Sequence, residues 1–140
     1  MFLCIPYTTT TSVPFVANKI HEHSLILAPI PQLKSRDDLS QVADFLFATK
    51  GTDVVVVYGI QRNKVLLSAR SRRENLHLGL LLSKQFPEGQ AGGHKGLAGG
   101  QILFETLGFE EFADVDEKGT EILDIMTEQL HNIFTLEDLS

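Results

Sequence analysis

The sequence of 140 residues has one cysteine and no long apolar run. Cys4 has no second cysteine with which to form a disulfide within the chain, and cysteine-based zinc sites need at least a pair of thiolates. The longest apolar stretches, Val54–Tyr58 and Leu78–Leu82, are much shorter than the ~20 residues that a transmembrane helix requires. These absences exclude an intrachain disulfide, a cysteine zinc site and a membrane-spanning helix.

The N-terminus lacks the features of a secretory signal peptide. Met1–Ile5 is apolar, but no basic residue precedes this stretch, and it is too short for the apolar core of a signal. Because the chain has only one cysteine, it is expected to reside in the reducing cytoplasm. Because it has no long apolar run, no membrane partner is expected.

Charge is distributed unevenly along the chain. The net charge is −6, yet residues 62–95 contain seven basic and two acidic side chains, whereas residues 105–138 contain one basic and eleven acidic side chains. The overall acidity argues against nonspecific binding to duplex nucleic acid. The basic middle segment instead predicts an anionic ligand at that part of the chain.

Hydrophobic periodicity predicts a single α/β domain with a mixed sheet of four or five strands flanked by helices. A chain of this length is expected to form one domain rather than two. Ser35, with Asp38 three residues later, resembles a capping box at a helix start. Gln61–Lys64 is a polar turn between two apolar runs and predicts a hairpin. We expect helices over 35–50, 78–86 and 120–134, and strands over 24–30, 54–58, 65–69 and 101–104.

The first 34 residues are expected to form a lead-in or interdomain connector. They are rich in threonine, and two of the five prolines lie within residues 1–14, which predicts irregular structure there. Val16, Ala17 and Ile20 at helical spacing predict a short helix, which is followed by the strand over 24–30. The chain is therefore divided into residues 1–34 and residues 35–140.

Residues 89–100 hold six of the eleven glycines. Glycine permits positive φ and has no Cβ, so backbone N–H groups can approach an oxyanion closely. His94 and Lys95 add side-chain donors, which suits binding of a phosphate or a terminal nucleotide; the alternative is a flexible surface loop. The segment is neither a Walker A loop nor a dinucleotide-binding fingerprint, because it lacks Gly-Lys-Ser/Thr and no predicted strand leads into it.

Residues 68–73, with the sequence Ser-Ala-Arg-Ser-Arg-Arg, form a second motif at the end of a predicted strand. Strand alternation should place Ser68, Arg70 and Arg72 on one face. Arginines beside hydroxyl groups suit bidentate recognition of phosphate. The alternative is a solvated basic turn.

The two motifs, in this order, resemble the DHH-associated (DHHA1) domain at the C-terminus of DHH phosphoesterases. The resemblance rests on Ser-Ala-Arg-Ser at 68–71, a helix with Leu-Gly-Leu-Leu, and Ala-Gly-Gly-His at 91–94, and it spans roughly residues 35–101. The family loop usually reads Gly-Gly-Gly-His, and here Ala91 replaces the first glycine. This form, followed by Gly-Gly-Gln-Ile, is most similar to the exopolyphosphatase-related branch.

The resemblance implies a division of labour between two domains. In such enzymes a DHH domain binds two manganese ions and hydrolyses the phosphodiester, whereas the DHHA1 domain holds the substrate. This sequence has no Asp-His-His triplet, so we expect no catalytic residue, metal ligand or cofactor in this chain, manganese in a separate DHH domain, and no activity of this chain alone. His21 and His23 are interpreted as an exposed helix end rather than a metal pair. The implied substrate-binding residues are Ser68, Arg70, Ser71, Gly92, Gly93, His94 and Lys95.

Two functions are consistent with these features. The first is the substrate-binding domain of a DHH-type phosphoesterase acting on short oligonucleotides, nucleotides or polyphosphate, with a DHH catalytic domain as a partner. The alternative is a stand-alone nucleic-acid-binding or assembly module without hydrolytic activity, since a related domain occurs in alanyl-tRNA synthetases. The expected ligand is short single-stranded nucleic acid, a nucleotide or polyphosphate, and a homodimer is left open.

Overall fold

A hairpin of two buried strands lies in the middle of the fold. β4 (Val54–Gln61) and β5 (Lys64–Ser71) are the strands that the sequence predicts around a two-residue turn, in which Arg62 has a φ of +59°. Nearly all of their side chains are buried, as expected for strands that are covered on both faces. The computed structural model describes residues 2–6, 14–20, 23–31, 33–49 and 51–136.

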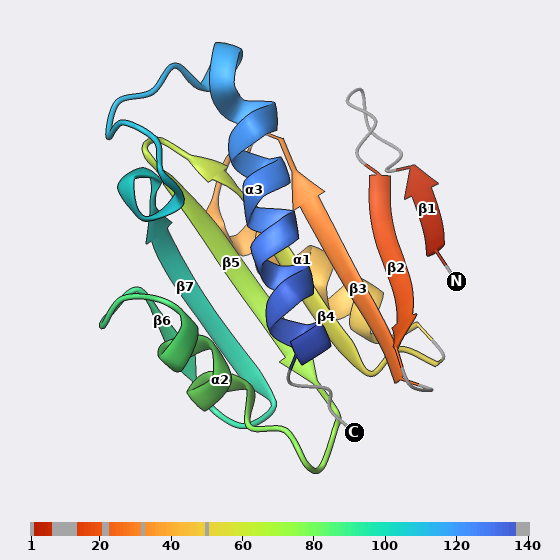
Figure 1. Ribbon diagram of the computed structural model, residues 1–140. Coiled ribbons are helices and arrows are strands. Elements are labelled where there is room, and N and C mark those ends of the chain that lie inside the picture. The colour runs from red at the N-terminus through yellow and green to blue at the C-terminus, as the bar shows by residue number, and fades with distance from the viewer. Residues whose placement is uncertain (1, 7–13, 21–22, 32, 50, 137–140) are drawn as a thin grey trace.

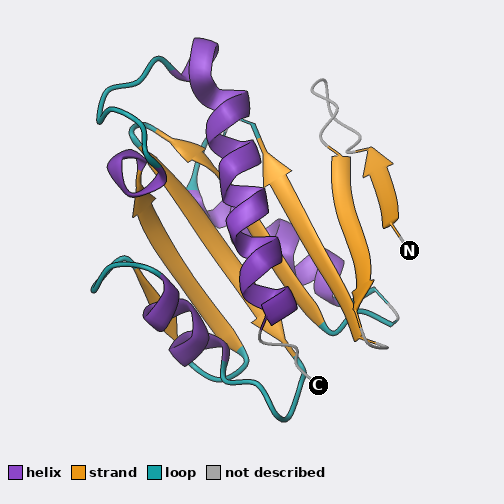
Figure 2. Cartoon of the chain, viewed as in Figure 1, coloured by secondary structure: helices purple, strands orange, loops and turns teal. Residues whose placement is uncertain are grey.

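Among the described residues, seven strands form one mixed sheet in the order β1-β2-β3-β4-β5-β7-β6 (Figures 1 and 2). The remaining strands are β1 (Phe2–Pro6), β2 (Pro14–Ile20), β3 (His23–Ile30), β6 (Ala91–Gly93) and β7 (Leu97–Leu103). β3 and β4 are parallel, and the other neighbouring pairs are antiparallel. The predicted α/β domain is therefore confirmed: five strands lie from residue 23 onward, and β1 and β2 extend the same mixed sheet.

Helices cover both faces of this sheet. α1 (Arg36–Phe47) connects β3 to β4 and lies on one face, while α2 (Leu78–Gln85) and α3 (Val115–Leu136) lie on the other (Figure 1). A short 3-10 helix, η1 (Phe104–Leu107), follows β7. The three predicted helices are confirmed, although α3 begins earlier than expected. None of the described helices has both the length and the hydrophobicity needed to cross a membrane.

The position of α1 follows from its cap and its apolar face. The Ser35 N–H donates to Asp38 Oδ2 at 3.3 Å, one of the two hydrogen bonds of the predicted capping box. Leu39, Ala43 and Leu46 then share one side of the helix and are buried against apolar residues of β3, β4 and β5. This packing fixes α1 across the middle of its face of the sheet.

The larger core lies on the opposite face, under α2 and α3. Ile122, Met126 and Leu130 form the buried stripe of α3 that the sequence predicts. Tyr58 of β4 is enclosed in this core, and its hydroxyl hydrogen-bonds to Thr127 Oγ1 on α3. α3 is therefore joined to the centre of the sheet by both apolar packing and a polar contact.

Two predictions about local structure are wrong. The short helix expected over residues 16–20 is part of β2, which pairs with both β1 and β3. A helical stripe over five residues is a weak signal, and the β-branched residues in it favour the extended backbone that strand pairing stabilises. The glycine-rich segment expected to be a loop forms β6 and much of β7, because the pairing of β7 with β5 and of β6 with β7 outweighs the low strand propensity of glycine.

Part of the expected connector belongs to the sheet. Phe2–Pro6, predicted to be irregular, is strand β1. Leu25–Ala28 of β3 is buried and pairs with β4, although it precedes residue 35. Residues 7–13 and His21 lie outside the described residues, so what the sequence predicts for them stays a prediction. The division of the chain at residue 35 also stays a prediction.

Candidate functional site

The hairpin of β6 and β7 brings backbone segments into very close approach. Gly93 has a φ of +149°, and a Cβ there would lie 2.7 Å from the Ala98 Cα. A Cβ at Gly100 would lie 2.5 Å from the Gln90 carbonyl oxygen. No side chain fits at either position, so this hairpin requires glycine at both.

The first turn of α2 is fixed to the turn of this hairpin. The Leu78 and Gly79 N–H groups donate to the carbonyl oxygens of Lys95 and His94, both at 2.9 Å. At the same helix end, the ring Nδ1 of His77 accepts a backbone N–H at 3.1 Å and caps the helix. These amides are therefore occupied within the protein, and they hold the backbone at His94 in a defined position.

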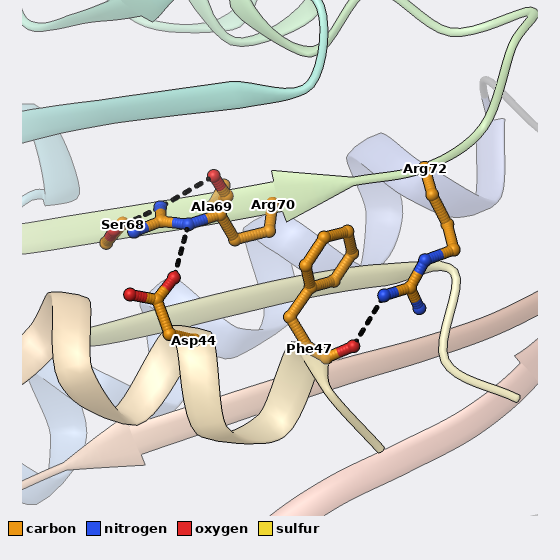
Figure 3. Close-up of polar contacts among 6 residues, drawn as sticks. All are labelled: Asp44, Phe47, Ser68, Ala69, Arg70 and Arg72. Atoms are coloured by element: carbon orange, nitrogen blue, oxygen red, sulfur yellow. Dashed lines mark hydrogen bonds and ion pairs between the residues drawn. The ribbon is translucent and has the colours of Figure 1, made fainter. Parts of the chain in front are cut away.

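Arg70 is held by groups on two elements (Figure 3). Its Nη1 donates to Ser68 Oγ at 2.8 Å and to the Ala69 carbonyl oxygen at 3.1 Å, both on β5, and its Nε donates to Asp44 Oδ1 on α1 at 3.2 Å. The Arg70 side chain is 10% exposed, whereas that of Asp44 is 70% exposed. The guanidinium is therefore oriented by the protein and nearly buried.

Strand register places Ser68 beside the glycine-rich hairpin. Ser68 of β5 lies opposite Gly99 of β7, and Gly99 lies opposite Gly92 of β6. Arg70 lies opposite Leu97 in a neighbouring row. Ser68 is thus next to two positions that have no side chain, and Arg70 follows two residues later on the same face of β5.

These residues line a cavity of about 230 Å³ between α1 and the glycine-rich hairpin, which we call the Arg70 cavity. Its lining consists of Arg36, Leu39, Ser40, Leu67, Ser68, Arg70, Gly92, Gly93, His94, Leu97, Ala98 and Gly99. The structure brings together five of the seven residues that the family resemblance implies, namely Ser68, Arg70, Gly92, Gly93 and His94. The cavity is slightly smaller than sites for drug-sized ligands, which suits a small anionic group.

The other two implied residues lie outside this lining. Ser71 is buried, and its Oγ accepts the Arg73 N–H at 3.1 Å. Lys95 Nζ lies 3.8 Å from Glu74 Oε2, and about half of the Lys95 side chain is exposed. Ser71 therefore supports the chain after β5, while Lys95 pairs with an acidic side chain at the surface.

Arg72 joins α1 to the chain beyond β5. It lies on the α1 side of the sheet, as strand alternation predicts, but it does not line the Arg70 cavity. Its guanidinium donates to the Phe47 carbonyl oxygen at 2.7 Å and lies 3.9 Å from the centroid of the Phe47 ring (Figure 3). It also donates to the carbonyl oxygen of Thr52. Of the two arginines that the strand motif predicts to face phosphate, only Arg70 therefore lines the cavity.

The contribution of α1 to the cavity could not be predicted from the sequence. Arg36, Leu39 and Ser40 come from the first turns of α1 and line the cavity opposite the hairpin. Arg36 follows the helix N-cap and has no neighbouring motif that would indicate a site. Only the packing of α1 across the sheet brings it to the cavity, so no local pattern could have identified it.

A larger cavity of about 740 Å³ adjoins the first, and we call it the Lys64 cavity. Arg36, Gly92 and Gly99 line both cavities. The rest of its lining is Lys64, Glu88, Gly89, Gln90, Ala91, Gly100, Gln101 and Leu103. Lys64 donates to Gln101 Oε1 at 3.2 Å and is a basic side chain to which the sequence motifs assign no role.

In the described part of the chain, no group of three or more His, Cys, Asp or Glu side chains is placed to hold a metal ion. One Asp-x-Asp pair, Asp114 and Asp116, lies at the start of α3. Asp114 Oδ1 accepts the Asp116 N–H at 3.0 Å, so this carboxylate acts as a helix cap. That manganese belongs to a separate DHH domain stays a prediction.

Comparison with solved structures finds two that are similar to this chain. The C-Ala domain of alanyl-tRNA synthetase from Aquifex aeolicus is 19% identical and has a TM-score of 0.54, over 81% of this chain and 96% of that one. A pGpG-specific phosphodiesterase from Vibrio cholerae is 15% identical and has a TM-score of 0.41, over 79% of this chain and 35% of that one. The first likeness confirms the fold, and the second is too distant to support more.

Sequence comparison identifies the family. An uncharacterized protein of Methanocaldococcus jannaschii is 32% identical over 84 residues, which make up 60% of this chain and 17% of that protein. This chain therefore spans less than a fifth of the length of that relative. The DHHA1 domain family matches residues 22–132, which is most of the chain. The chain therefore belongs to the DHHA1 domain family.

Proposed function

We propose that this chain is the substrate-binding part of a DHH-type phosphoesterase that acts on short oligonucleotides, nucleotides or polyphosphate. The observation that carries the proposal is the convergence of Arg70, Ser68 and His94 with glycine backbone on one cavity. Guanidinium groups form strong charge-assisted hydrogen bonds with phosphate oxygens. In this proposal the Arg70 cavity receives a phosphate group of the substrate.

The contacts of Arg70 prepare it for this role. Asp44 and Ser68 hold its Nε and Nη1, so the side chain loses little conformational freedom when a ligand binds. The Arg70 Nη2 donates no hydrogen bond to the described residues, and Arg70 lines the cavity. We infer that Nη2 and the Ser68 hydroxyl, which still has a proton to donate, contact the phosphate.

The glycine-rich hairpin supplies the other side of the cavity. Gly92 and Gly99 lack side chains, so a ligand can approach their backbone closely. His94 lies in the hairpin turn, is exposed, and can donate a ring N–H to an anionic oxygen. The phosphate would thus be held by donors from two separate segments of the sequence.

Isothermal titration with a short RNA tests the proposal. Arg70→Ala should weaken binding about 10- to 150-fold, because losing a charge-assisted hydrogen bond costs about 1.5–3 kcal/mol. Arg72→Ala is the matched control, since Arg72 is a nearby arginine outside the cavity lining. Circular dichroism verifies that both variants are folded. Unchanged affinity in Arg70→Ala, or an equal loss in the control, would contradict the proposal.

The same proposal assigns hydrolysis to a different domain. The family resemblance places the two manganese ions and the attack on the phosphodiester in a DHH domain. The purified chain, incubated with manganese and a short oligonucleotide, should therefore form no product above background. Turnover by this chain alone would show that the division of labour is wrong.

A stand-alone nucleic-acid-binding module is the alternative. The fold likeness that extends over 96% of the C-Ala domain of an alanyl-tRNA synthetase favours it. Competition between a short RNA and a folded tRNA separates the two functions. A substrate-binding domain for short oligonucleotides should prefer the short RNA, whereas a tRNA-binding module should prefer the tRNA.

A further inference from the structure

The Arg70 cavity and the Lys64 cavity are connected. Arg36, Gly92 and Gly99 line both of them, so the two hollows meet at these residues. Arg70 lines only the smaller cavity, and Lys64 lines only the larger one. Three basic side chains are therefore distributed along one connected depression, with Arg36 at the junction.

The positions of Lys64 and Arg70 set the length of this depression. They lie six residues apart in β5, which corresponds to about 20 Å at 3.3 Å per residue. Strand alternation places Lys64, Ser68 and Arg70 on the same face, the one that carries α1. A single phosphate group is too small to contact Arg70, Arg36 and Lys64 together, whereas a chain of phosphates can extend past all three.

The lining favours recognition of charge over recognition of bases. The described residues that line the two cavities include no phenylalanine, tyrosine or tryptophan, so they offer no ring on which a base could stack. Glu88 is the one acidic side chain among them. Neither Arg36 nor Lys64 forms an ion pair in the described part of the chain. Both cations are therefore available to an anionic ligand.

We propose that the two cavities form one groove for a linear chain of phosphates, which is read by its negative charge and length and not by its bases. Arg70 holds one end of the chain, and Arg36 and Lys64 contact phosphates farther along it. The inference rests on the proposed function of the Arg70 cavity and adds two binding residues to it. It applies to inorganic polyphosphate and to the backbone of an oligonucleotide, since both present the same repeated anion.

Binding of ligands of increasing length tests this groove. For the unmodified chain, affinity should rise at least tenfold from inorganic phosphate to tripolyphosphate, and rise again for longer chains. The double variant Arg36→Gln and Lys64→Gln should bind inorganic phosphate normally and lose the gain with length. The matched control is Lys34→Gln with Lys84→Gln, because both lysines are exposed and lie outside both linings.

Salt dependence gives a second readout with oligonucleotides. The slope of log affinity against log salt is about −0.7 per phosphate contacted on a single strand, so the double variant should reduce it by about 1.4. Short homopolymers of adenine and uracil should bind with equal affinity. A clear preference for one base would overturn the proposal, because the groove would then read more than charge.

The remaining outcomes separate this inference from the proposed function. The groove is overturned if binding depends on Arg70 but does not change with ligand length. It is also overturned if the double variant behaves like the control. Either result leaves the Arg70 cavity as the proposed phosphate site. Failure of every ligand to bind the unmodified chain overturns both. A length-dependent gain that disappears only in the double variant supports the groove.

Discussion

Arg70 and Arg72 lie two residues apart and on the same side of the sheet, yet their surroundings differ. Arg70 is nearly buried between β5 and α1, with Asp44 and Ser68 as partners and one edge toward a cavity. Arg72 uses its guanidinium on the carbonyl oxygen and ring of Phe47 at the end of α1. The partners of each guanidinium, and not the arginine itself, distinguish the proposed binding group from the structural one.

Tyr58 gives a test of burial at the level of one residue. Its ring is fully buried and its hydroxyl contacts Thr127, and burial raises the pKa of Tyr58 above its usual range. An unfolded tyrosine ionises at about pH 10. Above that pH the folded state therefore keeps a proton on Tyr58 that the unfolded state has lost. The contribution of Tyr58 to the free energy of unfolding should therefore be constant below about pH 10. As the pH rises further, the free energy of unfolding should fall.

Urea unfolding at several alkaline pH values, together with tyrosinate absorbance, measures this effect. Tyr58→Phe should lose about 1 kcal/mol at neutral pH, because the hydrogen bond to Thr127 is gone. The variant should also lose less stability than the unmodified chain as the pH rises. Parallel loss of stability in the two proteins, or ionisation of Tyr58 in the folded chain, would show that the ring is not enclosed.

The residue motifs predicted one part of the candidate site and not the rest. Two short sequence patterns contain Ser68, Arg70 and His94, so the sequence alone identifies these residues as candidates. Arg36 and Lys64 belong to neither pattern, because their roles depend on how α1 and β5 pack around a shared hollow. Contacts between distant segments cannot be predicted from a local motif.

At the scale of elements, α2 and the glycine-rich hairpin act as one unit. A Cβ on Gly79 would lie 2.1 Å from the Gly93 carbonyl oxygen, so the start of α2 rests directly on β6. Hydrogen bonds from this helix end to the carbonyl oxygens of His94 and Lys95 add to the contact. The shape of the hairpin turn therefore depends on how closely α2 can approach it.

Gly79→Ala should disrupt this contact. The new methyl group would overlap backbone atoms of Gly93, and overpacking of this kind costs about 1–3 kcal/mol, which exceeds the roughly 1 kcal/mol that alanine gains over glycine in a helix. Gly92→Ala is the control, because its Cβ would meet only the Ser83 Cβ at 3.8 Å. Urea midpoints compare their stabilities. Equal stability of the two variants would mean that α2 does not rest on β6.

The sequence predicts helices and strands correctly where the local pattern is strong. It fails where strand pairing determines the secondary structure. α1 and the hairpin of β4 and β5 have clear periodicity, a cap and a polar turn. β6 and β7 contain four glycines, whose strand propensity is low. β7 forms a strand because it pairs with β5, and β6 forms one because it pairs with β7. β7 therefore depends on a neighbour that is distant in the sequence, and β6 depends on β7.

At the scale of the whole molecule, the basic residues that line the two cavities and the acidic helix α3 lie on opposite faces of the sheet. Arg36, Lys64 and Arg70 line cavities on the face that carries α1. The acidic helix α3 covers the opposite face (Figure 1). An anionic ligand at the cavities therefore lies close to basic side chains, and the sheet separates it from the acidic helix α3. This arrangement favours anion binding on the α1 face.

The same sheet determines how much of the N-terminal segment the fold needs. Leu25, Ile26 and Leu27 of β3 are at most 7% exposed, and they pack on both faces between β4 and the helices. Burying each such side chain contributes about 1.5–3 kcal/mol, so removing three of them costs about 5–9 kcal/mol. That loss is comparable with the total stability of a typical domain, about 5–15 kcal/mol.

Two truncated chains test whether the domain begins at β3 or at residue 35. A chain of residues 23–140 keeps β3 and its parallel pairing with β4, and should unfold cooperatively in urea at a lower midpoint than the full chain. A chain of residues 35–140 loses β3, exposes the apolar edge and faces of β4, and should show no cooperative transition. Cooperative unfolding of the shorter chain would place the boundary at residue 35 and make β3 an accessory strand. The match of the family to residues 22–132 favours the earlier start, because it includes all of β3 and neither β1 nor β2.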